Sequence, residues 1–178
     1  MPEDFVFAAK LPKAITHEAR LIDVVAPLDR FLEETDGLGR KRGPILIQLP
    51  PSLVFDSLIA ADFFALVRNR TTGALVCEPR HLSWFTPEGE DLLASYQVAR
   101  VAADPPPVAS AGAPGGWPGL QYTRLHGSPQ PYRSSYDVAA IEFYAARARD
   151  ADIESWTMFD NTMTGAATLN ALDMRGQV

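Results

Sequence analysis

The chain alternates short apolar runs with segments of helical periodicity, and this alternation restricts its fold more than any other feature. Six runs are rich enough in apolar residues to be strands buried on both faces. These runs cover residues 5–10, 44–49, 74–78, 98–103, 120–126 and 153–160. Because strands separated by helices normally pair in parallel, the pattern predicts an α/β fold built from βαβ units.

Between most of these runs, apolar residues recur every three to four positions, as they do on the buried face of a helix. Residues 21–38 are the clearest example, and they end at Gly37 and Gly39, which are typical of a helix terminus. Comparable segments cover residues 55–70, 87–96, 138–149 and 165–174. Residues 104–119, "DPPPVASAGAPGGWPG", contain too much proline and glycine for a helix and predict an irregular surface loop.

Length and composition suit a single domain that covers residues 1–178. The formal net charge of −6 provides no general attraction to nucleic acid or to an anionic membrane. Cys77 is the only cysteine, which excludes an internal disulfide and a cysteine-based zinc cluster. The sequence has neither a run of about 20 apolar residues nor the pattern of a secretion signal, so we expect a cytoplasmic protein.

Several of the predicted strands carry a polar side chain near the carboxyl end, on the face that also carries small or apolar residues. These side chains belong to Lys10, Gln48, Glu78, Arg124 and His126. The last strand ends in Asp160 and Asn161, which face opposite sides, and the pattern does not decide which of them points inward. Because ligands bind at the carboxyl ends of parallel strands, we expect these groups to form one site.

The first hypothesis for this site is an enzyme of hydrolase or lyase type that acts on a small anionic or sugar-like substrate. Glu78 is the candidate acid or base, with Arg80 and Arg124 as a clamp for phosphate or carboxylate. Lys10 adds a third cation or an amine nucleophile. The candidate catalytic residues are Glu78, His126 and Asp160, and the candidate substrate-binding residues are Lys10, His17, Gln48, Arg80, His81, Trp84, Arg124, Tyr136 and Asn161.

Each of these candidates also has a purely structural interpretation. Glu78, Arg80 and Arg124 can form an ion-pair network that closes the mouth of a barrel. For His17, the alternative is a helix start at which the preceding residue, Thr16, is the cap. His81 can serve only to hydrogen-bond its own loop.

Further alternatives concern aromatic residues and metals. Trp84 and Tyr136 are placed to stack on a sugar or base, although single aromatic residues after strands more often pack in the core. A divalent metal is a further alternative, because several candidates are common ligands of hard or borderline ions. The potential ligands are His17, Glu78, His81, His126 and Asp160. Their spacing matches no diagnostic metal motif, and the sequence has no phosphate-binding P-loop or dinucleotide fingerprint.

Five segments resemble, in order, the domain of unknown function 72 family, also called YecE-like. They are "FVFAAKLPKAITHEARL", "GPILIQLPPSLVFD", "VCEPRHLSWF", "YTRLHGSPQPYRSSY" and "MFDNTMTGAATLNAL". The resemblance covers nearly the whole chain and implies a TIM-type (β/α) barrel. It implies no reaction, because the family has no established one, so the polar residues of these segments stay candidates.

The beginning of the chain departs from this family. Members typically open with a strand bearing glycine and tryptophan, followed by a strand rich in asparagine, serine, phenylalanine and tyrosine. Neither is present, so the resemblance implies a partial barrel with six of eight strands, the C-terminal three quarters of the fold. Met1 is then either an internal start or the edge of a truncated chain. Because such a barrel has two open strand edges, we expect poor solubility or self-association through them.

Two other functional hypotheses remain. The alternative to a small-molecule enzyme is a nucleic-acid-related protein, either a metal-assisted phosphodiesterase or a DNA- or RNA-binding module. This alternative depends on fold-level analogy to barrel endonucleases. The acidic net charge argues against it unless lysine and arginine residues gather at the mouth. A chain that is inactive because part of its barrel is missing is the third hypothesis.

Overall fold

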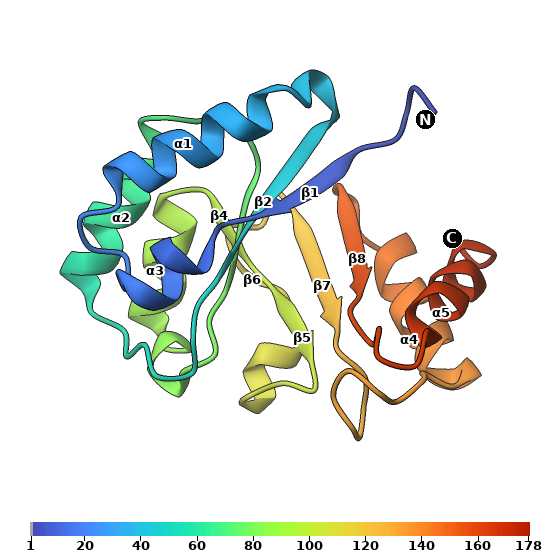
Figure 1. Cartoon of the computed structure of the whole chain (residues 1–178). Helices are drawn as coiled ribbons and strands as arrows, with labels where there is room; N and C mark the ends of the chain where they lie inside the picture. The colour runs from blue at the N-terminus through green and yellow to red at the C-terminus, as the bar shows by residue number, and fades with distance from the viewer. Residues whose placement is uncertain (1) are drawn as a thin grey trace.

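A computed structural model describes residues 2–178 and contains every strand that the apolar runs predict. The strands are parallel and neighbour one another in chain order (Figure 1). The fourth run is divided at Val101, whose amide donates to Cys77 O, so that its first half pairs with the preceding strand and its second half with the following one. The strands are β1 (Phe7–Lys10), β2 (Arg42–Gln48), β3 (Leu75–Glu78), β4 (Val98–Arg100), β5 (Ala102–Asp104), β7 (Gln121–Leu125) and β8 (Ser155–Phe159).

Five α-helices cover the outer side of these strands (Figure 1). They are α1 (Val25–Asp36), α2 (Ser57–Arg68), α3 (Pro87–Ser95), α4 (Val138–Arg149) and α5 (Ala166–Arg175). All five agree with the predicted segments except at the start of the first, which begins four residues later than expected. Arg20, Leu21 and Asp23 have positive φ angles of 51°, 73° and 54°. Since such angles are incompatible with a right-handed helix, these residues form a turn before α1.

The turn after β1 also differs from the prediction. Residues Ala14–Glu18 form a single π-helical turn, η1. The Thr16 hydroxyl contacts Pro12 O at 3.5 Å and His17 Nδ1 at 2.8 Å. Thr16 therefore caps no helix, and that prediction was wrong, because the residue lies inside the turn rather than before it.

Residues 104–119 are more ordered than the predicted irregular loop. They contain a 3₁₀ turn, η4 (Ala109–Gly112), and a two-residue strand, β6 (Gly115–Gly116), which is antiparallel to β4. The Gly116 amide donates to Glu90 Oε2 at 2.6 Å, and a Cβ at Gly115 would approach Nη2 of Arg100 to 2.5 Å. Glycine is thus required here because the backbone lies directly against the ion pair between the buried Arg100 and the half-buried Glu90.

Apolar side chains lie in three clusters. One fills the space between β1–β4 and α1–α3, and another fills the space between the pair β7 and β8 and the pair α4 and α5. The third lies inside the curve of the strands. Its buried members are Leu46, Val76, Ala99, Val101, Leu120 and Tyr122. The side chains that the alternation along each strand predicted to point inward are therefore the ones on the inner face. Because these strands are parallel, the carboxyl ends of β1, β2, β3 and β7 lie around one rim.

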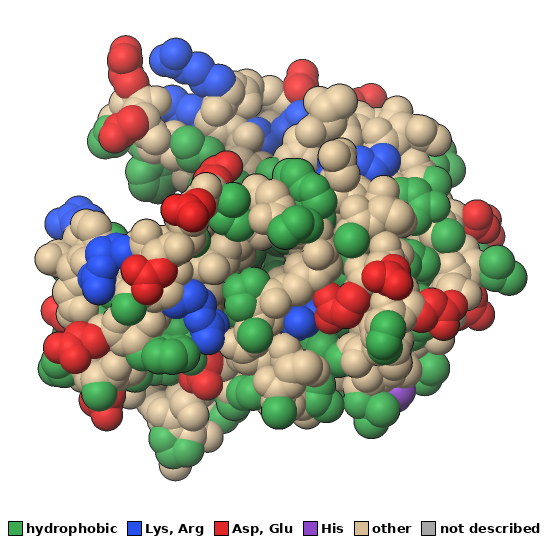
Figure 2. All heavy atoms as spheres, turned by 180° about the vertical axis from the view of Figure 1, so that it is seen from behind, with side chains coloured by type: hydrophobic (Ala, Val, Ile, Leu, Met, Phe, Trp, Pro, Cys, Tyr) green, Lys and Arg blue, Asp and Glu red, His purple; other side chains and the backbone are tan. Residues whose placement is uncertain are grey.

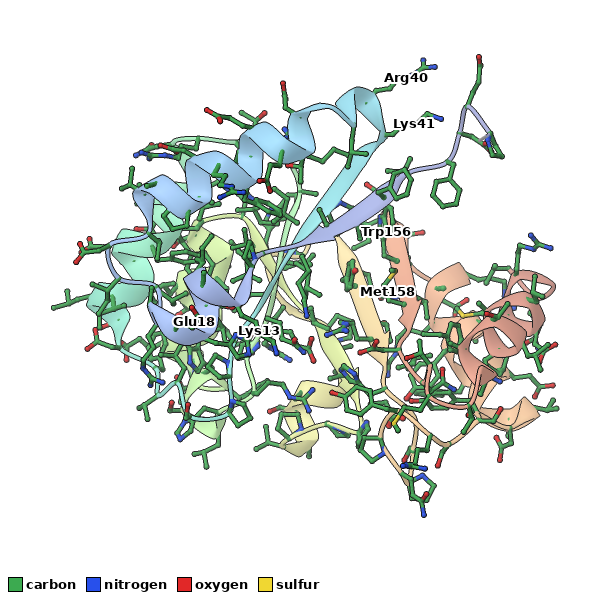
Figure 3. All side chains as sticks on the ribbon, viewed as in Figure 1. Lys13, Glu18, Arg40, Lys41, Trp156 and Met158 are labelled. Carbon is green, nitrogen blue, oxygen red and sulfur yellow. The ribbon has the colours of Figure 1, made fainter. Side chains whose placement is uncertain are left out.

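The strands form an open barrel, in agreement with the predicted partial TIM-type fold. Among residues 2–178, β1 pairs only with β2, and β8 pairs only with β7. The surface is hollowed between the amino-terminal segment and the α4–α5 pair (Figure 2). Trp156 and Met158, which extend from β8, pack against the inner cluster (Figure 3). Self-association through the free edges of β1 and β8 stays a prediction.

At the end of the barrel opposite the rim, Arg68 joins two loops, the one between α2 and β3 and the one between α3 and β4. Its guanidinium donates to Tyr96 O at 2.6 Å, Gly73 O at 2.7 Å and Gln97 O at 2.5 Å. Burial lowers the pKa of Arg68. These contacts connect the end of α2 to the starts of β3 and β4.

We expect Arg68→Met to lower the free energy of unfolding by about 2 kcal/mol, because three carbonyl groups lose a charged donor while the aliphatic part of the side chain remains. Urea denaturation measures this change. Arg175→Met, in the exposed last turn of α5, is the matched control and should change the free energy by less than about 0.5 kcal/mol. Equal effects of the two substitutions would contradict the role assigned to Arg68.

Among residues 2–178, no helix has both the length and the apolar composition needed to cross a bilayer.

Candidate functional site

The carboxyl ends of three parallel strands bring a set of charged side chains together at the rim. Glu78 is the last residue of β3, and Arg124 is the fourth residue of β7. His126 follows β7 directly, and Asp160 follows β8 directly. Together with Arg80, two residues beyond β3, these four residues form what we call the rim cluster. Their proximity has two causes. The strands are parallel, so their carboxyl ends lie at the same end of the barrel, and residues that alternate along a strand point to the same face.

Glu78 lies at the centre of the rim cluster and is only 1% exposed. Its Oε1 atom is 2.8 Å from Arg80 Nη1 and 2.9 Å from His126 Nε2. Its Oε2 atom accepts from Arg124 Nη1 at 2.5 Å and from Gln48 Nε2 at 3.2 Å. Gln48 pairs in register with Glu78 across β2 and β3, which explains this last contact. Four donors therefore surround one buried carboxylate.

Asp160 completes the rim cluster from the other side. Its Oδ2 atom accepts from Arg124 Nη2 at 2.7 Å and is 3.0 Å from His126 Nδ1. His126 thus lies between two carboxylates, one at each ring nitrogen. An imidazole in this position is favoured in its doubly protonated form, because both nitrogens then donate.

These contacts shift the pKa of each ionisable group in a consistent direction. Burial alone would raise the pKa of Glu78, but the hydrogen bond from His126 and the charge of Arg124 outweigh burial and hold it at about 2. Burial would lower the pKa of His126, but the hydrogen bonds to Asp160 and Glu78 raise it above its usual value. The hydrogen bond from His126 lowers the pKa of Asp160 in spite of burial. The two carboxylates of the rim cluster are therefore ionised at neutral pH, and they favour the protonated form of His126.

An open cavity of about 290 Å³ lies beside the rim cluster, on the inner side of β1 and β8. Its lining includes Lys10, Leu46, Tyr122, Arg124, Met158 and Asp160. The Lys10 ammonium is exposed and contacts only Gln48 Oε1, at 3.5 Å, among residues 2–178. A larger cavity of about 460 Å³ lies outside β8, but its lining contains no carboxylate or histidine. Another cavity, of about 480 Å³, is lined by Asp104, Tyr136 and Asp137 but by no lysine or arginine. Of these three cavities, the smallest is therefore the one that is lined by both cationic side chains and a carboxylate side chain.

Positive charge exceeds negative charge around this cavity. The carboxylates are those of Glu78 and Asp160, and both are already paired with Arg124. Lys10 forms no ion pair with any carboxylate in the described part of the chain, residues 2–178. The lining itself contains two permanent cations, Lys10 and Arg124, and one carboxylate side chain, that of Asp160.

Two of the predicted histidines do not join the rim cluster. His17 contacts Thr16, and its pKa is lowered by burial and by the nearby charges of Lys13 and Lys10. His81 accepts a hydrogen bond from the Ser83 amide at 3.2 Å and begins a 3₁₀ turn, η3 (Leu82–Trp84). The contacts of His81 therefore match the alternative in which this residue hydrogen-bonds its own loop.

The predicted aromatic residues lie away from the cavity. Trp84 is 1% exposed and belongs to the outer core, where Nε1 donates to Leu53 O at 2.9 Å. The turn η3 directs the indole under the helices instead of toward the mouth, so the placement of Trp84 in a binding site is corrected. Tyr136 also lies outside the cavity, because its hydroxyl is held by Asp104 Oδ2 at 2.7 Å and by the Gly127 amide at 2.8 Å.

The structure also decides between the two residues that end the last strand. Asp160 points into the barrel, whereas Asn161 is fully buried on the other side. The Asn161 amide donates to Ser134 O and to Asn170 Oδ1, both at 2.9 Å. Asn161 therefore supports the loop after β7, and its prediction as a substrate-binding residue was wrong.

Tyr122, which lines the cavity, was missing from the predicted site. Its signal in the sequence is its parity with Arg124, two residues later on the same strand. For the alternative of a divalent metal, residues 2–178 contain no group of three histidine, cysteine, aspartate or glutamate side chains that could hold an ion. The two carboxylates of the rim cluster are instead turned toward guanidinium groups.

Comparison with known proteins identifies relatives across the whole chain. A family model described as "Protein of unknown function DUF72" matches residues 1–178. A crystal structure of a DUF72 family protein from Thermotoga maritima has a TM-score of 0.80 at 22% identity, and the match covers 99% of this chain and 74% of that one. A DUF72 family protein from Enterococcus faecalis gives a TM-score of 0.78 at 21% identity, covering 99% of this chain and 79% of that one. At such identities the likeness shows the fold alone, and no functionally curated protein matches the sequence.

Proposed function

Because the chain belongs to the DUF72 family, as its sequence segments predicted, and this family carries no assigned function, we propose a function from the rim geometry alone. The cavity beside the rim cluster binds a small organic anion, with Lys10 and Arg124 facing its charged group. The observation that carries this proposal is the excess of cations around an open cavity of about 290 Å³. That volume suits a ligand at the small end of the usual range.

Lys10 is the main electrostatic contact for such a ligand. Arg124 is shared between two carboxylates, whereas the Lys10 ammonium donates, among residues 2–178, only to the side chain of Gln48. A bound anion gives Lys10 a counter-charge at the edge of the barrel, where the effective dielectric constant is lower than in bulk water. Glu78 and Asp160 do not repel the anion strongly, because their charges are balanced by Arg124 and by the protonated His126.

Within this proposal the predicted roles of the carboxylates change. Glu78 has a pKa of about 2 and both of its oxygens are occupied, so it positions Arg124 and His126 and does not accept a proton from a substrate. Asp160 Oδ1 has no hydrogen-bond partner in residues 2–178, and Asp160 lines the cavity. Asp160 is therefore the group placed for proton transfer in hydrolase or lyase chemistry.

We expect Lys10→Met to weaken binding of inorganic phosphate at least tenfold, as measured by isothermal titration calorimetry at low ionic strength. The matched control is Lys41→Met. Figure 3 places Lys41 beside Arg40, at the end of β2 remote from the mouth, whereas Lys13 lies near the mouth. Lys41 carries the same charge and donates only to Pro2 O, so its loss should change the affinity less than twofold. Wild-type protein that does not bind phosphate, or equal losses in the two variants, would refute anion binding at this cavity.

A further inference from the structure

The side chain of Tyr122 is almost fully buried, and its hydroxyl has no hydrogen-bond partner among residues 2–178. The residue is 1% exposed and lies between β5 and β8 on the inner face of β7. Its hydroxyl makes no hydrogen bond to any other residue in the range 2–178, and the side chain lines the cavity. Because a tyrosine hydroxyl set this deeply normally finds a partner, one that borders a cavity and has none in the protein can bond only to a molecule in that cavity, which is either water or a ligand.

The position of this hydroxyl is well defined. The Tyr122 ring is parallel to the Trp156 ring, with centroids 6.4 Å apart and an interplanar angle of 11°. Leu46 and Val76 pack in the same inner cluster and restrict the ring further. Burial raises the pKa of Tyr122 to about 12, although the charge of Arg124 lowers it in part. The group is therefore a neutral hydroxyl that can both donate and accept a hydrogen bond.

A second free polar atom lines the same cavity. Asp160 uses only Oδ2 for its contacts with Arg124 and His126, which leaves Oδ1 as an acceptor. Tyr122 and Asp160 thus offer a donor-acceptor pair next to the cations Lys10 and Arg124. An inorganic anion uses the cations but has no hydroxyl on a neighbouring carbon that could reach Tyr122 and Asp160 together.

We propose that the ligand is a hydroxylated anion, in which the charged group faces Lys10 and Arg124 and a hydroxyl on a neighbouring carbon bonds to Tyr122 Oη and Asp160 Oδ1. Short sugar phosphates and hydroxy acids have this chemistry. The inference depends on the proposed function, since it adds a requirement for hydroxyl groups to an anion site. Tyr122 is a positioning and specificity residue in this arrangement.

The test compares glycerol 3-phosphate with propyl phosphate, which has the same charge and carbon chain but no free hydroxyl. We expect wild-type protein to bind glycerol 3-phosphate at least tenfold more tightly in calorimetric titration. Tyr122→Phe should reduce this preference to less than threefold and leave the affinity for propyl phosphate unchanged. Equal binding of the two compounds by wild-type protein would overturn the inference while anion binding stands, and binding of neither would overturn both.

A second measurement separates this role from a structural one. Tyr122→Phe keeps the ring and removes a hydroxyl without a protein partner, so the melting temperature should not fall. Tyr136→Phe is the matched control, because it removes a hydroxyl that contacts Asp104 and Gly127. The control should melt at a lower temperature and retain the preference for glycerol 3-phosphate. A loss of stability in Tyr122→Phe as large as in the control would show that its hydroxyl serves the fold and would overturn the inference.

Discussion

Replacing Glu78 with alanine is expected to lower the free energy of unfolding by about 3–5 kcal/mol, which is the range for breaking a buried ion pair from one side. The substitution leaves the buried Arg124 and His126 with Asp160 as the one carboxylate that contacts them among residues 2–178. Gln48 and Arg80 lose an acceptor at the same time. The loss should therefore exceed that of any single surface charge. Urea denaturation at pH 7 measures it.

Two further variants separate the contribution of charge from that of shape. Glu78→Gln keeps the size of the side chain and one acceptor oxygen, so it should cost less than Glu78→Ala but more than about 1 kcal/mol. Arg30→Ala removes an exposed pair with Glu34, whose side chains are 79% and 60% exposed, and should cost no more than about 0.5 kcal/mol. A Glu78→Ala variant as stable as Arg30→Ala would mean that the rim cluster does not form as described.

The stability of the protein is also expected to fall steeply in acid. The pKa of Glu78 is lowered from 4.5 to about 2 in the folded state, so its contribution is fully present above pH 4.5 and is lost as the pH falls toward 2. This difference corresponds to about 3 kcal/mol. Asp160, whose pKa is also lowered, acts in the same direction. Free energies of unfolding measured by urea denaturation at pH values from about 2.5 to about 5 should show this slope.

The opposite sign applies to His126. Its pKa is raised above 6.5 in the folded state, so its contribution is present below pH 6.5 and is lost as the pH rises through the raised value. His126→Gln should therefore be less stable than wild type in weak acid and lose the alkaline decline. His17→Gln is the control. The pKa of His17 is lowered from 6.5 in the folded state, so its titration changes stability only below pH 6.5 and should leave the alkaline decline in place. An alkaline decline that persists in His126→Gln would contradict the assignment.

Much of the fold and part of the site were predictable because they depend on local periodicity. The alternation of side chains along β2, β3 and β7 correctly placed Gln48, Glu78 and Arg124 on the inner face. The late start of α1 was not predictable in this way. Its cause is a run of positive φ angles, which neither hydrophobic spacing nor glycine content signals at Arg20 and Leu21.

The residues beyond the strand ends were placed with less success. After β3, Arg80 reaches Glu78, but Trp84, four residues later, is turned into the outer core. After β8, Asp160 faces Arg124 while its neighbour Asn161 supports a loop. In such segments the backbone no longer alternates regularly, so the direction of a side chain depends on the turn and on what it packs against.

The sequence by itself determined that six strands alternate with helices and that charged side chains gather where those strands end, because strand periodicity and helix periodicity are properties of neighbouring residues. Only the tertiary structure decided which charges meet and which polar atoms stay free. Arg124 contacts Glu78 and Asp160 from strands 46 and 36 residues away in the chain. The Tyr122 hydroxyl remains without a protein partner because the space beside it, between β1 and β8, is open. Both outcomes follow from which strands become neighbours, and that depends on packing over the whole chain.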